Sequence, residues 1–223
     1  MMLWAWQRSE DLRFLNPRGT GVAHLVETLW LSGDGVRVEL NFDPLIVPVG
    51  TWVMGCVRIE IDPLAPARLS PAELKASVAA LLNAARAPGI SGLQIDFDAT
   101  DSQHGFYRRL LSQLRQRLPP AQPLSMTALV SWCGGDSWLT DLPVDEIVPM
   151  FFNMGPAGPA ILRRVDAMRR LPEPRCNGSV GINLGSPVPR LPDAARHYIF
   201  DNGSWSQSAW TALRREMLRE VPR

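Results

Sequence analysis

Short apolar runs alternate with amphipathic segments along the whole chain. The apolar runs are rich in branched and aromatic residues and are bounded by Gly, Pro, Asp and Ser, a pattern typical of β-strands. Several of the segments between them have the spacing of amphipathic helices. The strand candidates begin at Leu3, Gly21, Trp52, Ile90, Leu124, Glu146, Gly178 and Arg196.

The clearest helix signal is the segment "SPAELKASVAALLNAAR". Ser70 is expected to be its N-cap, Pro71 takes the first helical position, and Glu73 completes a capping box. The segments "SQHGFYRRLLSQLRQRL", "PAILRRVDAMRRL" and "SQSAWTALRREML" also place apolar residues at helical spacing. Strands that alternate with helices predict an α/β fold with a parallel sheet.

Eight strand candidates predict one (β/α)8 barrel of the TIM type, spanning residues 1–223 as a single domain. A doubly wound open sheet is the alternative. Between the second and third strands, "SGDGVRVELNFDPLIVPVG" carries a turn signal and alternating residues, so we expect a β-hairpin insertion there instead of a helix. The last third is rich in Pro and short of helix, so we expect the barrel to be somewhat irregular.

Composition excludes several classes of function. Apolar residues make up 46% of the chain, charged residues 20%, and the net charge is +1, so no charge bias favours nucleic acid or a membrane surface. No apolar run is long enough to span a membrane. The first residues lack the basic and apolar regions of a signal peptide. We therefore expect a cytoplasmic protein, or an exported one if the start is misplaced and a signal peptide is missing.

Cysteines and histidines give no sign of a metal site. Cys56, Cys133 and Cys176 are widely spaced and form no C-x-x-C, so we expect neither a disulfide framework nor a zinc site, and favour buried small hydrophobes. The histidines lie on different elements. The chain also lacks G-x-S-x-G, P-loop and G-x-G-x-x-G motifs, so we expect no cofactor and no serine-hydrolase or nucleotide chemistry.

The strand "LQIDFD" carries acids in an apolar run. Alternation along a strand places Gln94, Asp96 and Asp98 on one face, toward the inside of a barrel. Inward positions are normally apolar, and barrel active sites lie at the carboxyl ends of the strands. Two carboxylates two residues apart on one face are close enough to couple, so one holds its proton more tightly, as a general acid must.

The neighbouring strand, "CVRIEID", adds two charged residues. Alternation places Arg58 and Glu60 on the inward face, with Glu60 near the strand end, beside Asp98. One interpretation is an ion network of Arg58, Glu60 and Asp96 that only stabilises the core. The other is that the same network tunes a catalytic acid.

Other strand ends supply candidate ligand contacts. Trp132, Asp136 and Trp138 surround a Gly-Gly turn, and aromatic faces with a carboxylate suit a sugar subsite, although tryptophans in loops also serve as ordinary packing. Asn183 and Asp201 end the last two strands; a turn or helix N-cap is the favoured role for Asp201. On the first strand we expect one of two tryptophans, Trp4 or Trp6, to reach the interior while the other packs outward.

The spacing of "SGLQIDFD" resembles the D-G-x-D-x-D-x-E signature of family 18 glycoside hydrolases. Gly92 matches the glycine, Asp96 the third acid, and Asp98 the proton-donating glutamate, one methylene shorter. Ser91 and Gln94 replace the first two aspartates. The resemblance implies a barrel that cleaves sugars.

That family also carries M-x-Y-D on its sixth strand. Met150 matches the methionine, whereas Phe152 and Asn153 replace the tyrosine and aspartate. The resemblance implies that the tyrosine hydroxyl, which positions an N-acetyl group, is absent, so we do not expect substrate-assisted cleavage of the chitinase kind.

Longer motifs are similar to an uncharacterised bacterial family, domain of unknown function 3142. They are "LWAWQRSEDLRFL", "TGVAHLVETLWLSGDGV", "VRIEID", "LQIDFDAT", "ALVSWCGGDSWL" and "LPVDEIVPMFFNMG". The activity of that family is unassigned, so the resemblance implies only a barrel related to sugar-cleaving enzymes.

The sequence therefore predicts a glycoside-hydrolase-like barrel that acts on a polysaccharide or oligosaccharide. Asp98 would protonate the leaving oxygen, Asp96 would tune and orient it, and Glu60 would be the base or nucleophile. A separation of about 5 Å between Glu60 and Asp98 would imply retention, and roughly 6.5–9.5 Å inversion. The alternatives are a catalytically inactive glycan-binding barrel and a barrel enzyme acting on another substrate.

Overall fold

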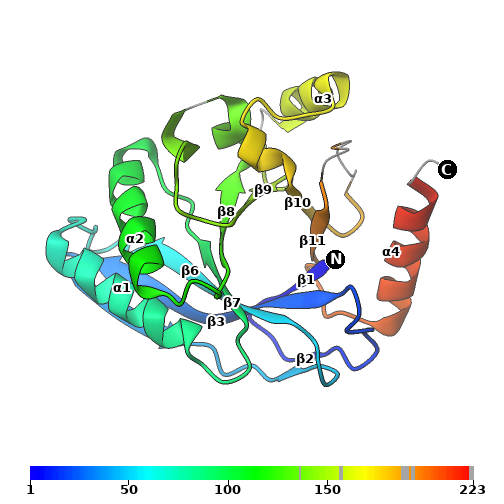
Figure 1. Cartoon of the computed structure of the whole chain (residues 1–223), viewed down its shortest axis with the longest axis horizontal. Coiled ribbons are helices and arrows are strands. Elements are labelled where there is room, and N and C mark those ends of the chain that lie inside the picture. The colour runs from blue at the N-terminus through cyan, green and yellow to red at the C-terminus, as the bar shows by residue number, and fades with distance from the viewer. Residues whose placement is uncertain (136, 156–157, 187–190, 192–193, 221–223) are drawn as a thin grey trace.

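The computed structural model describes residues 1–135, 137–155, 158–186, 191 and 194–220 (Figure 1). Within these residues, eight parallel strands form a closed ring in which the first strand pairs with both the second and the last. This confirms the predicted (β/α)8-type barrel and excludes an open sheet. The barrel strands are β1 (Met2–Ala5), β3 (Gly21–Ser32), β6 (Val53–Ile61), β7 (Gly92–Asp96), β8 (Leu124–Leu129), β9 (Glu146–Met150), β10 (Ser179–Asn183) and β11 (Arg196–Phe200).

A pair of short strands occupies the region between the second and third barrel strands. β4 (Gly35–Leu40) turns back and pairs antiparallel with β3, from Ser32 opposite Gly35 to Glu27 opposite Leu40. β5 (Leu45–Ile46) then pairs with β2 (Glu10–Asp11) in a separate two-stranded sheet. β4 is the last strand on its side of the larger sheet.

The helices cover the outside of the barrel. They are α1 (Pro71–Ala85), α2 (His104–Arg117), α3 (Gly158–Met168) and α4 (Gln207–Glu220). Figure 1 shows α1 and α2 side by side on one flank and α4 on the other. None of the helices in the described part of the chain combines the length and apolar character needed to cross a bilayer.

The predicted capping box at the start of α1 is present. The Ser70 hydroxyl accepts a hydrogen bond from the Glu73 backbone N–H at 3.3 Å, and the Glu73 carboxylate accepts one from the Ser70 N–H at 2.9 Å. Two backbone donors of the first turn are thereby satisfied.

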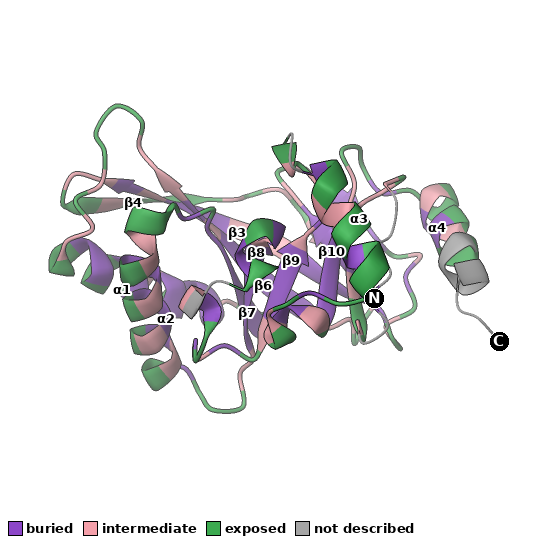
Figure 2. Cartoon of the chain, turned by 90° about the horizontal axis from the view of Figure 1, so that it is seen from above, coloured by how far each residue is buried: buried purple, intermediate pink, exposed green. Residues whose placement is uncertain are grey.

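Most residues of the barrel strands are buried (Figure 2). Their buried apolar side chains form two clusters. Outward-facing residues such as Leu29, Ile59 and Ile95 belong to the cluster that also contains the apolar residues of α1 and α2. A smaller cluster around Trp4 and Tyr198 fills the interior. Gly181 belongs to this interior, where a Cβ would come within 2.8 Å of the Trp4 ring, so only glycine leaves room for the indole.

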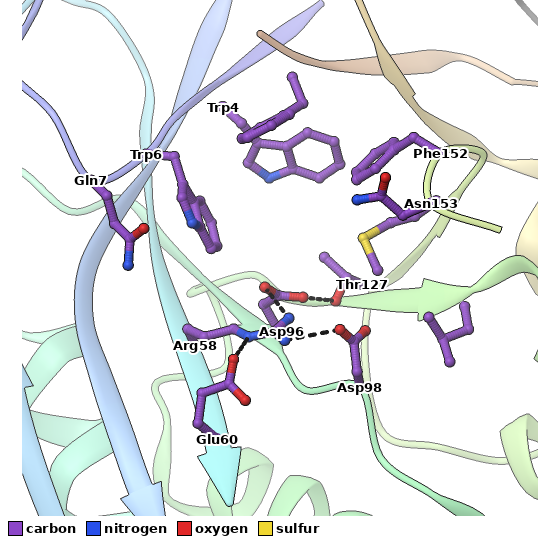
Figure 3. Close-up of a pocket in the computed structure, with 13 residues that line it drawn as sticks. Trp4, Trp6, Gln7, Arg58, Glu60, Asp96, Asp98, Thr127, Phe152 and Asn153 are labelled. Carbon is purple, nitrogen blue, oxygen red and sulfur yellow. Dashed lines mark hydrogen bonds and ion pairs between the residues drawn. The ribbon is translucent and has the colours of Figure 1, made fainter. Parts of the chain in front are cut away.

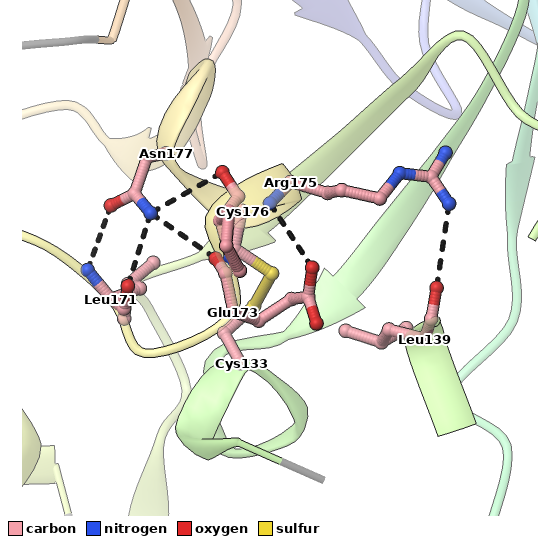
Figure 4. The surroundings of a disulfide bond; sticks show 8 residues. Cys133, Leu139, Leu171, Glu173, Arg175, Cys176 and Asn177 are labelled. Carbon is pink, nitrogen blue, oxygen red and sulfur yellow. Dashed lines mark hydrogen bonds between the residues drawn. A yellow bond between two sulfur atoms is a disulfide. The ribbon is translucent and has the colours of Figure 1, made fainter. Parts of the chain in front are cut away.

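One prediction about the cysteines is wrong. Cys133, after β8, and Cys176, just before β10, form a disulfide whose Cα atoms are 6.0 Å apart across a sequence separation of 43 (Figure 4). No local spacing in the sequence predicts this bond, because closure of the barrel brings together two connecting segments that are far apart in sequence. Cys56 is a buried free thiol, as expected.

Candidate active site

A cavity of about 370 Å³ opens at the carboxyl ends of the barrel strands (Figure 3). Active sites of (β/α)8 barrels lie at this end, since loops of variable sequence there surround the strand ends. The cavity is lined by Trp4, Trp6, Gln7, Arg58, Glu60, Asp96, Asp98, Thr127, Leu129, Met150, Phe152, Asn153 and Phe200.

Arg58 is the centre of the charged part of the cavity. Its Nε donates to Glu60 Oε1 at 2.7 Å, its Nη1 to Asp96 Oδ2 at 2.9 Å, and its Nη2 to Asp98 Oδ2 at 2.9 Å. The inward orientation predicted from alternation in "CVRIEID" and "LQIDFD" is thus observed for all of them. One guanidinium donates hydrogen bonds to all three carboxylates, which reduces the cost of placing so many acids at this strand end.

Asp96 is the buried member of the network. Besides the Arg58 contact, its Oδ1 accepts a hydrogen bond from the Thr127 hydroxyl at 2.6 Å. Burial raises the pKa of Asp96 above its usual value; Arg58 and Thr127 oppose this effect, and the charge of Asp98 adds to it. Asp96 therefore binds a proton more readily than an exposed aspartate.

Asp98 and Glu60 are the accessible carboxylates. Their side chains are 40% and 38% exposed, whereas that of Asp96 is 6% exposed. Asp98 lies just beyond the end of β7, and Glu60 lies one residue before the end of β6. A ligand in the cavity can therefore contact both carboxylates from the solvent side.

The Arg58 guanidinium remains charged in this setting. Burial by itself lowers its pKa, but the charges of Asp96 and Asp98 and the hydrogen bonds to Glu60 and Asp96 raise it above the usual arginine value. The network is therefore an ion cluster and not a set of neutral hydrogen bonds.

Aromatic rings form the opposite wall. Phe152 stacks on Phe200 at 5.9 Å between ring centroids, and Trp4 meets Phe152 edge-on at 6.0 Å. Trp6 packs edge-on against Phe200 at 6.4 Å. In Figure 3 the rings of Trp4, Trp6 and Phe152 face Asp98 and Glu60 across the cavity. The cavity thus has one aromatic side and one acidic side.

Trp4 is held in place by hydrogen bonds inside the barrel. Its indole N–H donates to Gln94 Oε1 at 2.8 Å, and Gln94 Nε2 donates to the Ser125 hydroxyl at 3.1 Å. Trp4 and Trp6 both face the cavity, so the prediction that one would pack outward is wrong. Residues two apart in an extended segment share a face.

Two lining residues have left-handed backbone conformations. Gln7 has φ of 38° and Asn153 has φ of 54°. Side-chain-bearing residues adopt positive φ at a cost of order 1 kcal/mol, and such residues cluster at functional sites. Both follow barrel strands, β1 and β9, at the cavity mouth.

Most of the predicted site residues meet at the cavity. Asp98, Asp96, Glu60 and Arg58 form the ion cluster. The cavity wall also includes Met150, Phe152 and Asn153.

The tryptophans of the predicted subsite lie elsewhere. Trp138 stacks on His104 of α2 with centroids 4.0 Å apart, and Trp132 meets Trp138 edge-on at 4.8 Å. Neither lines the cavity. Both therefore pack the connection after β8 onto α2, and Asp136 lies outside the described residues.

The candidates on the last two strands are not in the cavity wall either. Asp201 Oδ1 accepts a hydrogen bond from the Gly203 N–H at 2.9 Å, the turn role that sequence analysis favoured. Asn183 ends β10, and its buried side-chain oxygen has no hydrogen-bond partner in the described part of the chain.

The cavity wall also includes four residues that were not predicted from the sequence: Gln7, Thr127, Leu129 and Phe200. Alternation was the available signal for the last three, which lie at the last inward positions of β8 and β11. Gln7 has a left-handed backbone conformation, which alternation along a strand does not predict. Within the described residues, no group of three potential ligands gathers as a metal would require.

Comparison with known proteins agrees with this architecture. Residues 52–148 match a family model described as a domain of unknown function (DUF3142), which confirms the resemblance seen in the motifs. A comparison with curated proteins finds no similar sequence.

Several solved structures share the fold. A protein described as a chitinase A candidate from Streptomyces coelicolor is 12% identical, with TM-score 0.57, over 96% of this chain and 94% of that one. The Bacillus cereus spore cortex-lytic enzyme SleL is 17% identical, with TM-score 0.51, over 96% of this chain and 57% of that one.

A fungal endo-beta-N-acetylglucosaminidase from glycosyl hydrolase family 18 is 15% identical, with TM-score 0.51, over 98% of this chain and 85% of that one. At these identities the likeness shows that the chain shares the barrel fold of these proteins.

Proposed function

We propose that this barrel acts on a polysaccharide or oligosaccharide by carboxylate acid/base catalysis. The observation that carries the proposal is the cavity at the carboxyl end of the strands, with accessible Asp98 and Glu60 facing an aromatic wall. Aromatic rings pack on the C–H faces of sugars, and a pair of carboxylates is the usual machinery for cleaving a glycosidic bond.

Each carboxylate has a distinct role in the proposal. Asp98, at the cavity mouth, protonates the leaving oxygen of the glycosidic bond. Asp96, held by Thr127 and Arg58, supplies the coupled charge behind it and orients the network. Glu60, on the adjacent strand, serves as the base or nucleophile.

The ion pair with Arg58 sets a condition on this mechanism. Asp98 donates a proton only after it has left Nη2 of Arg58 and taken up a proton. We therefore propose that hydroxyl groups of the incoming sugar displace Asp98 from Arg58. Arg58 meanwhile keeps its hydrogen bonds to Glu60 and Asp96.

A catalytically inactive glycan-binding barrel is the second candidate. Arg58 contacts all three carboxylates, and Phe152 and Asn153 stand where family 18 enzymes carry tyrosine and aspartate. Both observations favour a cavity that holds a glycan without cleaving it.

The substitution Asp98→Asn separates the two candidates. A reducing-sugar assay across a panel of polysaccharides would identify a substrate, and binding of its oligosaccharides would be measured alongside. Under the catalytic proposal, D98N lowers turnover by roughly 10²–10⁴-fold and retains binding. D101N, at an exposed position outside the cavity, is the control and keeps full turnover.

Two outcomes would contradict catalysis. The first is unchanged turnover in D98N. The second is glycan binding without release of reducing ends from any member of the panel, which supports the binding barrel.

We also propose that the chain works in an oxidising compartment. The disulfide between Cys133 and Cys176 supports this, because such bonds persist in exported proteins and are rare in the cytosol. The proposal departs from the cytoplasmic expectation. Thiol titration of the denatured, non-reduced protein from its native host would yield one free cysteine if it holds, and three if it fails.

A further inference from the structure

The charge of the cavity indicates which class of saccharide it suits. Among the described lining residues, the charged side chains are Arg58, Glu60, Asp96 and Asp98. One positive and three negative charges give a net charge of −2, or −1 if Asp96 keeps its proton. The cavity is therefore negative in either protonation state.

The hydrogen-bonding groups of the cavity also favour a ligand that donates hydrogen bonds to carboxylates. Arg58 donates through Nε, Nη1 and Nη2 to the three carboxylates. Trp4 and Thr127 donate to Gln94 and Asp96. Within the described part of the chain, Glu60 Oε2 and Asp98 Oδ1 accept no hydrogen bond, so charged acceptors remain for a ligand while the charged donors already have partners.

The aromatic wall is compatible with a cation as well. An ammonium group close to the face of an indole or phenyl ring is attracted by the ring quadrupole, and Trp rings give the strongest effect. Trp6 and Phe152 stand opposite the free carboxylate oxygens (Figure 3). A cationic group in the cavity would therefore be attracted both by the aromatic rings on one wall and by the carboxylates on the other.

We propose that the cavity takes a saccharide with free, protonated amino groups, such as an oligomer of glucosamine, in preference to neutral, N-acetylated or acidic sugars. This rests on the proposed function, since it assumes that the cavity binds a saccharide. It adds the substrate class: the ammonium group donates to Glu60 and Asp98, and the sugar ring lies against the aromatic residues.

The test compares oligosaccharides of equal length at pH 6, by titration calorimetry. Hexamers of glucosamine, N-acetylglucosamine, glucose and galacturonic acid are the probes. The glucosamine hexamer should bind at least tenfold more tightly than the glucose hexamer, and added salt should weaken only the former.

Glu60→Gln removes one negative charge and keeps the shape. E60Q should weaken glucosamine binding by roughly three- to tenfold more than it weakens glucose binding. D34N, in the exposed turn between β3 and β4, should change neither.

The outcomes separate this inference from the proposed function. Glucose or N-acetylglucosamine hexamers that bind as tightly as glucosamine would overturn the inference and leave the proposed function standing. If none of the four binds, the inference is overturned, and the assay across the polysaccharide panel decides the proposed function separately.

A second, independent observation concerns the edge strand β4. No strand in the described residues pairs with its outer edge. Exposed large apolar side chains gather on β4 and just beyond it, among them Phe42 at 84% and Val49 at 100% exposure, with Val38, Leu40 and Ile46. An exposed edge with apolar side chains is a template for strand pairing.

The charges on β4 select one self-pairing register. When two copies of a strand pair antiparallel about a two-fold axis, residues that lie opposite each other point to the same face of the sheet. Residues on one face are an even number of positions apart, so the residue at the centre of the pairing lies opposite the same residue of the other copy. If Val38 is the central residue, Arg37 of each copy lies opposite Glu39 of the other, which gives two pairs of opposite charge. Val36 of each copy then lies opposite Leu40 of the other. Centring on Arg37 or Glu39 would instead oppose like charges.

We infer that β4 pairs with β4 of a second copy of this chain in that register, extending the sheet across a dimer. Sedimentation velocity of the wild type should show a dimer. R37E and E39R, which oppose like charges, should each raise the dimer dissociation constant at least tenfold, and the R37E/E39R swap should restore it.

Melting temperatures of the same variants control for unfolding, since Arg37 and Glu39 also pair within one chain. A wild type that stays monomeric up to 100 µM would overturn the inference. So would folded single variants that dimerise as well as the wild type.

Discussion

Nη2 of Arg58 lies 2.9 Å from Oδ2 of Asp98, so the carboxylate best placed to meet a ligand is ion-paired before any ligand arrives. The same guanidinium also binds Asp96 and Glu60. A structural and a catalytic reading of the acids in "LQIDFD" are therefore compatible, because one arginine both stabilises the strand end and positions the acids.

Replacing Arg58 by Met should destabilise the fold by about 3–5 kcal/mol, because it leaves neighbouring carboxylates without their cation. R58K keeps the charge but not the three-way geometry, and should lose less. Urea unfolding at pH 7 measures both. The difference in free energy of unfolding between R58M and the wild type should shrink as pH falls, because the acids become protonated. An R58M variant as stable as the wild type at pH 7 would show that the network contributes nothing to stability.

Thr127→Val removes the hydroxyl that donates to Asp96. A hydrogen bond to the charged form lowers a carboxyl pKa, so its loss should raise the pKa of Asp96 further above the usual value. The carboxyl ¹³C shift of Asp96, followed by NMR during a pH titration, reports this directly. T127S retains the hydroxyl and should titrate like the wild type. A T127V midpoint at or below that of the wild type would contradict the assignment.

Glu27 makes stability depend on pH. Burial raises the pKa of Glu27 to about 7, and its Oε1 has no hydrogen-bond partner among the residues that the structure describes. Because the folded-state value lies above the unfolded one, the protonated form favours folding, and stability is lost as pH rises from about 4.5 through about 7.

Glu27→Gln should remove this loss. At pH 8 it should gain about 1–3 kcal/mol, since no charge is buried, which corresponds to roughly 2–4 °C per kcal/mol in melting temperature. At pH 4 the two proteins should melt together. A variant that melts lower than the wild type at pH 8 would indicate that the Glu27 charge has a stabilising partner.

The disulfide should contribute measurably to stability. It closes a long loop, with a sequence separation of 43 between Cys133 and Cys176, so C133S/C176S should lose about 2–4 kcal/mol. Reductant should lower the melting temperature of the wild type and leave that of the double variant unchanged. If reductant shifts both proteins equally, another thiol is responsible for the effect.

Local patterns determined much of this protein. Strand alternation placed Arg58, Glu60, Asp96 and Asp98 on the inward face, and the spacing of Ser70 and Glu73 identified the start of α1. These features are readable from sequence because each depends on neighbours within a few residues: the two-residue period of a strand and the first turn of a helix.

The contacts between distant residues follow from the tertiary structure alone. Asp98 pairs with Arg58, 40 positions away, and Phe200 lines the same cavity as Trp6. Cys133 forms a disulfide with Cys176, and Trp132 packs against His104 of α2 and not in the cavity. Such contacts depend on how strands far apart in sequence close into a ring, and closure follows from packing over the whole barrel, which no local spacing records.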